Sequence, residues 1–226
     1  MTELPFANRA AAGRALAQKL DAREYANPVV YALPRGGVPV ALEIARKLAA
    51  PMDLLLVRKI GVPRHEELAA GSIVDGEQPD IIVNDEIVHA AGMSKAAFHD
   101  AAARALKEIE RRRELYLGDA KPIAAKGATA ILVDDGIATG ASMRAAIEAV
   151  RRREPKKVVV AVPVSSRDAA IEFSELADAF VCVAAPADFG AVGYYYRDFS
   201  QLTDEEVIAL MRQARALGSE PQLEAK

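Results

Sequence analysis

Two adjacent acids, Asp134 and Asp135, stand between an apolar run at residues 130–133 and a turn of small residues at 136–142. Beyond the turn, apolar residues recur at helical spacing, at Met143, Ala146, Ile147 and Val150. A turn of this kind at the start of a helix presents backbone N–H groups and a partial positive charge, which favour a phosphate. Carboxylates facing that phosphate would repel it. The two acids must therefore face another group, such as sugar hydroxyls or a metal ion.

Two further loops carry polar or basic residues directly after apolar runs. Residues 34–37, Pro-Arg-Gly-Gly, follow a run at 28–33, and Arg58 and Lys59 follow a run at 53–57. The carboxyl ends of parallel strands meet at one edge of a sheet, where open α/β sheets bind ligands. The loop at 34–37 offers backbone donors and one guanidinium, and Arg58 and Lys59 offer two cations. The third loop offers two acids beside a turn that can hold a phosphate. Together they suit a ligand with two separated phosphate groups joined by a polyol.

The elements that must position these loops are short apolar runs alternating with amphipathic helices. This alternation predicts an α/β fold, a mostly parallel twisted sheet with helices on both faces. The predicted strands are residues 28–33, 53–57, 130–133, 157–162 and 178–183. The predicted helices are residues 8–22, 38–49 and 94–117, one starting near Ser166, and one at 203–215. Residues 68–74 and 80–84 predict a hairpin with a long turn, and a mobile flap is one interpretation of it.

Composition and charge restrict the class of protein. With 226 residues and 51% hydrophobic content, the chain can bury a large core, and we predict a single domain at residues 1–215 with a flexible tail at 216–226. A net charge of −3 argues against a nucleic-acid binder with a broadly basic surface. The arginine groups at 111–113 and 151–153 are interpreted as solvated helix ends, which the helix macrodipole favours.

The N-terminus lacks the pattern of a signal peptide, and no apolar run approaches membrane-spanning length. We therefore expect a soluble cytoplasmic protein. Its single cysteine, Cys182, lies in an apolar run and is expected to be a buried, reduced thiol.

Residues 131–142 closely resemble the phosphoribosyl diphosphate signature of the type I phosphoribosyltransferases, in which an apolar strand leads into two acids and a Thr-Gly turn. Residues 34–37 look like the diphosphate-binding loop of that family, and Arg58-Lys59 lie where many members carry a basic pair before a flexible catalytic loop. Within the family, the chain is most similar to bacterial predicted phosphoribosyltransferases whose acceptor is not established. One departure is Gly136, where many members carry an aliphatic residue, so we expect a more pliable loop.

The resemblance implies a role for each candidate residue. Asp134 and Asp135 would accept hydrogen bonds from the ribose hydroxyls and stabilise positive charge on the ribose. A Mg²⁺ ion would be held mainly through the ligand, with Asp134 or Asp135 reaching it through water. Arg35 and Lys59 would neutralise the diphosphate. The other implied contacts to the phosphates are Pro34, Gly36, Gly37 and Arg58, and the 5′-phosphate loop Gly136, Ile137, Ala138, Thr139, Gly140, Ala141 and Ser142.

The implied reaction is displacement of diphosphate at C1 of phosphoribosyl diphosphate by a ring nitrogen of a nucleobase or related heterocycle. Family members place a hood over the base, and the matching segment here, residues 184–201, concentrates aromatic side chains. Phe189, Tyr194 and Tyr195 are the candidates to stack on the heterocycle, with Asp198 reading its edge. The alternative is that these aromatic residues pack the core or a dimer interface.

Two alternative functions stay open. One is a regulatory protein that binds phosphoribosyl diphosphate or a nucleotide without turnover. It ranks second because about 27 residues precede the first strand, too few for a winged-helix module, and the chain is not basic. The other is a hydrolytic nucleotide-processing enzyme on the same fold. The expected partners are small-molecule substrates and, by the resemblance, a second copy in a homodimer, with no nucleic acid and no membrane.

Overall fold

The computed structural model describes residues 4–63, 65–76 and 78–219. Within these residues, five strands form a central parallel sheet in the order β2-β1-β6-β7-β8. The strands are β1 Pro28–Ala32, β2 Met52–Leu54, β6 Thr129–Val133, β7 Lys157–Val164 and β8 Ala179–Ala184. The register pairs Ala32 of β1 with Val133 of β6, so these two strands end side by side.

Helices cover both faces of this sheet because successive strand residues point to opposite sides. Ile131 and Val159 belong to one hydrophobic cluster, whereas Leu132 and Val160 belong to a second. The first cluster includes α1 Arg9–Ala17, α2 Gly37–Leu48, α4 Lys95–Leu117 and α7 Asp204–Ser219, and the second includes α5 Ala141–Arg152 and α6 Arg167–Leu176. The predicted parallel α/β class with helices on both faces is confirmed.

Several helices begin at the residues that their capping signals predict. The hydroxyl oxygen of Ser94 accepts a hydrogen bond from the N–H of Ala97, and that of Ser166 accepts one from Ala169, at 3.2 Å each. Thr203 and Glu206 cap each other reciprocally at 2.8 and 3.2 Å. Helix α7 runs to Ser219, past its predicted end, and residues 220–226 of the predicted tail lie outside the described residues. No helix of the described chain is both long enough and apolar enough to cross a membrane.

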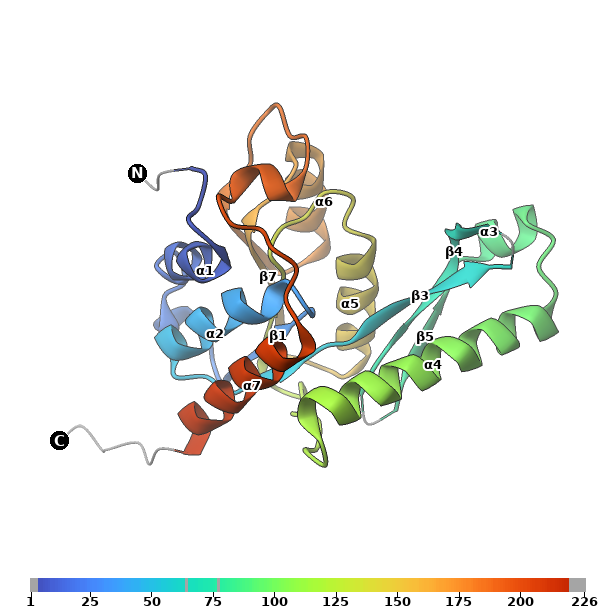
Figure 1. Cartoon of the computed structure of the whole chain (residues 1–226), viewed down its shortest axis with the longest axis horizontal. Coiled ribbons are helices and arrows are strands. Elements are labelled where there is room, and N and C mark those ends of the chain that lie inside the picture. The colour runs from blue at the N-terminus through green and yellow to red at the C-terminus, as the bar shows by residue number, and fades with distance from the viewer. Residues whose placement is uncertain (1–3, 64, 77, 220–226) are drawn as a thin grey trace.

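A second, antiparallel sheet forms the flap, which we define as strands β3 Val57–Val62, β4 His65–Val74 and β5 Asp80–Val83. It extends beside α4 away from the central sheet, and the short helix α3 Asp85–Ala90 lies near its far end (Figure 1). The predicted hairpin corresponds to β4 and β5. The third strand, β3, and the helix α3 were not predicted.

The strand predicted at 53–57 exists as β2, but it ends earlier than predicted, and the predicted placement of the basic pair at the sheet edge is wrong. Strand β2 ends at Leu54, and the chain then turns into β3, so that Arg58 and Lys59 lie within a flap strand instead of a loop at the sheet edge. The cause is a reciprocal contact with the end of β4. The N–H of Leu56 donates to the Asp75 carboxylate at 2.7 Å, and the N–H of Asp75 donates to the Leu56 carbonyl at 2.9 Å.

Cys182 lies in the edge strand β8 and is half-buried, whereas the sequence predicted a buried thiol. Burial raises the pKa of its thiol to about 11. Because the thiolate is the reactive form, we expect iodoacetamide at pH 7.5 to alkylate the native protein on the order of a hundredfold more slowly than the urea-unfolded chain. Mass spectrometry of timed aliquots measures both rates, and equal rates would contradict this account of the thiol.

Candidate active site

The two acids lie at the carboxyl edge of the central sheet, directly after β6. Both are half-buried, and an Asp134 carboxylate oxygen accepts the N–H of Asp135 at 2.8 Å. Burial and the adjacent Asp135 carboxylate raise the pKa of Asp134 well above its ordinary value. Burial also raises the pKa of Asp135, against the opposing effect of the Arg9 guanidinium. This corner therefore concentrates negative charge where water is partly excluded.

Arg9, which the sequence analysis missed, holds the Asp135 carboxylate. Its Nε lies 2.7 Å from Asp135 Oδ2, and a second guanidinium nitrogen donates to the Ser200 carbonyl at 2.8 Å. The guanidinium also stacks 4.0 Å from the ring centre of Phe199. Since 126 residues separate Arg9 from Asp135 and no motif includes both, no local signal in the sequence identifies the pair.

The loop at 34–37 packs directly against the acids. A methyl group added at Gly36 would overlap the Asp135 carboxylate, and one added at Gly37 would lie 2.5 Å from the Val133 carbonyl oxygen. Two of the three predicted loops are therefore in contact, and each glycine is needed for the close approach. Arg35 extends from the same loop, which has a cis peptide bond after Pro34, and its guanidinium lies 3.5 Å from the Asp204 carboxylate.

The small-residue turn keeps most of its backbone donors available. Ala138, Thr139, Ala141 and Ser142 are exposed, and within the described chain no hydrogen bond engages their N–H groups. Gly140 adopts φ +73° at the N-cap of α5, a conformation that glycine favours. Ile137 differs from the prediction, because it is buried and its N–H donates to the Val164 carbonyl at 2.9 Å. The exposed backbone donors of the turn are therefore those that follow Ile137.

Gly136 has a packing role, and the expected pliability of its loop stays a prediction. A methyl group at this position would lie 2.6 Å from a methyl of Val192 and 3.0 Å from one of Val164. The glycine therefore allows the hood, residues 184–201, to pack closely over the turn.

The structure does not place Arg58 and Lys59 beside the acids. They line a cavity of about 510 Å³ between β3 and α4, together with Arg104. The Arg58 guanidinium lies 3.9 Å from the Glu108 carboxylate of α4. Their contact with the diphosphate stays a prediction.

The hood residues predicted to contact an acceptor fall into two groups. Phe189 stacks on Tyr195 with ring centres 5.4 Å apart, and Tyr194, in the 3₁₀ turn η2 Val192–Tyr195, has 78% of its surface exposed. Asp198 instead accepts hydrogen bonds from Ser200 and lines a cavity of about 330 Å³ that Arg9 also lines. The neighbouring Tyr196 is buried, and its hydroxyl donates to the Asp135 carbonyl.

A parallel α/β sheet with paired acids and exposed backbone donors at its carboxyl edge is typical of proteins that bind nucleotides or sugar phosphates. The family model of the phosphoribosyl transferase domain matches residues 6–197. The chain belongs to this family, as the sequence resemblance predicts.

Solved and curated relatives agree with this assignment. Two Mycobacterium tuberculosis proteins, from strains CDC 1551 / Oshkosh and ATCC 25618 / H37Rv and each named "Putative phosphoribosyl transferase", are 44% identical over 209 residues. The match covers 92% of this chain and 47% of theirs, so the chain spans about half the length of these relatives. The crystal structure of TT1426 from Thermus thermophilus has a TM-score of 0.79 at 40% identity, with 91% of this chain and 97% of that chain covered.

Proposed function

We propose that this chain uses phosphoribosyl diphosphate and Mg²⁺ to transfer the phosphoribosyl group to a ring nitrogen of a nucleobase or related heterocycle. The observation that carries the proposal is the contact of Gly36 with Asp135, since it joins the loop at 34–37 and the acids into one site. The exposed donors at 138–142 continue from the same strand end. A ligand with two phosphate groups would bind one at each loop, with its ribose over the acids.

In the proposed reaction the bond from C1 to the diphosphate oxygen breaks, and diphosphate leaves with the electron pair. The acceptor nitrogen forms the new bond to C1 and releases its proton. Asp134 and Asp135 accept hydrogen bonds from the ribose hydroxyls, and their negative charge stabilises the positive charge developing on the ring. Arg35 neutralises the leaving diphosphate. Lys59 and Arg58 would contribute after movement of the flap.

The residues at the acid corner fit a Mg²⁺ ion bound mainly through the substrate. Mg²⁺ prefers oxygen ligands and in phosphate-binding sites commonly uses one or two carboxylates, substrate oxygens and water. Asp134 and Asp135 supply such carboxylates, and within the described part of the chain no cluster of three or more metal-binding side chains occurs. When bound, the ion supplies positive charge that stabilises the leaving diphosphate.

The acceptor would bind under the hood. The Phe189–Tyr195 stack and the exposed ring of Tyr194 offer flat apolar surface for a heterocycle. Asp198 is proposed to accept a hydrogen bond from the heterocycle edge. Homodimerisation and a cytoplasmic location stay predictions, and light scattering of the purified protein tests the first.

A thermal-shift experiment with phosphoribosyl diphosphate tests the binding half of this proposal. At a ligand concentration about 100 times Kd, binding stabilises the native state by about 2.7 kcal/mol. For a chain of this size we expect the Tm to rise by about 5–10 °C with Mg²⁺ present, and by much less with EDTA. The Ala141→Glu variant is a matched control, because its carboxylate would occupy the phosphate-binding turn and suppress the shift.

Diphosphate release across a panel of purines, pyrimidines and other nitrogen heterocycles tests the catalytic half. Release that depends on one acceptor, with formation of its 5′-monophosphate, supports the proposal. A Tm shift without release on any acceptor would favour the regulatory alternative, and release of free base or phosphate without an acceptor would favour the hydrolase. Absence of both a Tm shift and diphosphate release would refute the proposal.

A further inference from the structure

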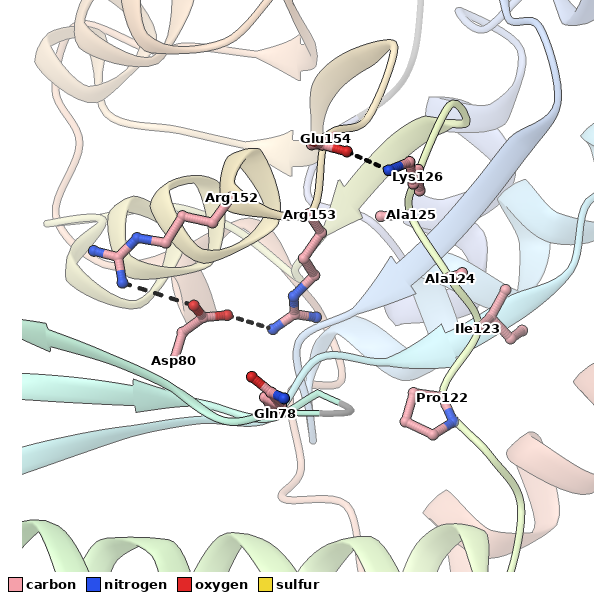
Figure 2. Close-up of a pocket in the computed structure, with 10 residues that line it drawn as sticks. All are labelled: Gln78, Asp80, Pro122, Ile123, Ala124, Ala125, Lys126, Arg152, Arg153 and Glu154. Atoms are coloured by element: carbon pink, nitrogen blue, oxygen red, sulfur yellow. Dashed lines mark hydrogen bonds and ion pairs between the residues drawn. The ribbon is translucent and has the colours of Figure 1, made fainter.

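A cavity of about 490 Å³ lies at the amino ends of the central strands, whereas the acids lie at their carboxyl ends. Its lining includes residues 122–126, which precede β6, and residues 152–154, which precede β7. Three segments enclose it (Figure 2): the C-terminal end of α5, the linker at 122–126 that precedes β6, and Asp80 at the start of the flap strand β5 together with the nearby Gln78. Its volume falls in the range of small-molecule sites. Arg152 and Arg153, interpreted from the sequence as solvated helix ends, both line it.

The charged side chains of the cavity can bind an anion with little loss of free energy from their existing ion pairs. Lys126, Arg152 and Arg153 supply three positive charges, and Asp80 and Glu154 supply two negative charges, which leaves a net charge of +1. The Lys126–Glu154 pair is 2.6 Å long, but its side chains are 76% and 70% exposed. Exposed ion pairs of this kind contribute about 0–1 kcal/mol. A phosphate could therefore replace Glu154 as the partner of Lys126.

Arg152 is engaged mainly by an exposed partner on its own helix. Its guanidinium lies 2.6 Å from the Glu148 carboxylate, with side chains 48% and 52% exposed, and 3.6 Å from the Asp80 carboxylate. Arg153, in contrast, is only 23% exposed, lies 3.1 Å from Asp80 and donates to the Asp75 carbonyl. Arg153 therefore fixes the flap against α5, whereas Arg152 and Lys126 are held by exposed ion pairs, with Glu148 and Glu154, that a ligand phosphate can replace at little cost in free energy.

The linker gives the cavity an apolar wall. Pro122, Ile123, Ala124 and Ala125 form a continuous stretch along one side, opposite the two arginines (Figure 2). A site with cations on one side and aliphatic carbon on the other suits a phosphate monoester that carries a flat or apolar organic group. Inorganic phosphate would use only half of it.

From these features we infer that this cavity is a second ligand site, which binds an organic phosphate of nucleoside-monophosphate size. The site is separate from the acids but mechanically linked to them. Helix α5 has 12 residues and spans about 18 Å from the phosphate-binding turn to this cavity. Asp80 belongs to the flap sheet that carries Arg58 and Lys59. A bound ligand would therefore contact both the helix that follows the turn and the sheet that holds the basic pair.

Calorimetric titration with AMP tests the inference, and the Ala141→Glu variant separates this site from the phosphate-binding turn. We expect Ala141→Glu to retain AMP binding. The double variant Lys126→Gln/Arg152→Gln, in the Ala141→Glu background, should weaken AMP binding at least about tenfold, a loss of about 1.4 kcal/mol. Both side chains are substantially exposed, so their replacement should leave the fold intact.

A matched control removes two positive charges nearby. Arg151 and Lys157 are exposed and do not line the cavity, so Arg151→Gln/Lys157→Gln should leave AMP affinity unchanged. Hydrogen exchange should also show AMP-dependent protection at residues 122–126 and 80–83. The inference is overturned if Ala141→Glu does not bind AMP, if both double variants bind it equally, or if inorganic phosphate binds as tightly as AMP.

Discussion

Gly36→Ala is expected to destabilise the protein and to weaken its binding of phosphoribosyl diphosphate. The backbone at Gly36, with φ −59° and ψ −36°, is accessible to alanine, so the conformation itself imposes no penalty. The added methyl group would instead overlap the Asp135 carboxylate. Forced overpacking of this kind costs about 1–3 kcal/mol, and relief requires the loop or the acid to move. Chemical denaturation and calorimetry with Mg²⁺ and phosphoribosyl diphosphate measure the two effects.

A double-mutant cycle assigns the cost to this one contact. In an Asp135→Ala background the overlapping atoms are gone, so Gly36→Ala should then cost less than in the wild-type chain, with a coupling energy of about 1–2 kcal/mol. Gly190→Ala is a matched control, because the three atoms nearest to its methyl group would all belong to the ring of Tyr194, which is exposed and can move away. Equal costs of Gly36→Ala in both backgrounds would show that the loop and the acid do not touch.

Much of the fold could be predicted because local patterns and tertiary structure agree. The apolar runs that became β6 and β7 are buried on both faces, as expected of interior parallel strands, and the caps at Ser94 and Ser166 fix where their helices begin. The acids follow β6 without an intervening residue, so the strand prediction alone places them at the sheet edge. Local sequence was therefore sufficient for these parts of the site.

The predictions that failed concern segments whose structure depends on contacts between residues far apart in the sequence. The run at 53–57 is apolar after Asp53. The N–H of Leu56, however, donates to the carboxylate of Asp75, 19 residues away, and the chain continues into the flap strand β3. For the same reason the role of Arg9 was not predicted, since its partner Asp135 lies 126 residues further along the chain. The cavity beside Arg152 and Arg153 likewise requires the linker and the flap to meet, which no periodicity indicates. Side-chain contacts of long sequence separation thus carry information that the local pattern lacks.

Arg9→Ala is expected to have a large effect on stability and on the pH range of ligand binding. The Arg9 and Asp135 side chains are only 11% and 15% exposed, so removal of the guanidinium leaves a carboxylate without its cation in a partly dry site. Breaking such a pair costs about 3–5 kcal/mol. Arg14→Ala on the same helix is the matched control, because Arg14 is 59% exposed and lies 3.8 Å from Glu43, and its loss should cost about 0–1 kcal/mol.

The pH dependence distinguishes loss of charge pairing from loss of packing against Phe199. Burial already raises the pKa of Asp135 and Arg9 opposes that effect, so the variant should have a still higher pKa at this position. A raised native pKa means that the ionised form destabilises the native state, by an amount that is complete above that pKa and declines as pH falls from it toward the pKa of the unfolded chain. The stability deficit of Arg9→Ala should therefore be largest at pH 8 and shrink toward pH 5, whereas a packing defect would be constant.

Binding of Mg²⁺ and phosphoribosyl diphosphate should shift to higher pH in parallel, because the proposed ribose contact needs the ionised carboxylate. Denaturation and calorimetry at pH 5, 6.5 and 8 give both profiles, and a deficit that does not vary with pH would assign Arg9 a packing role alone.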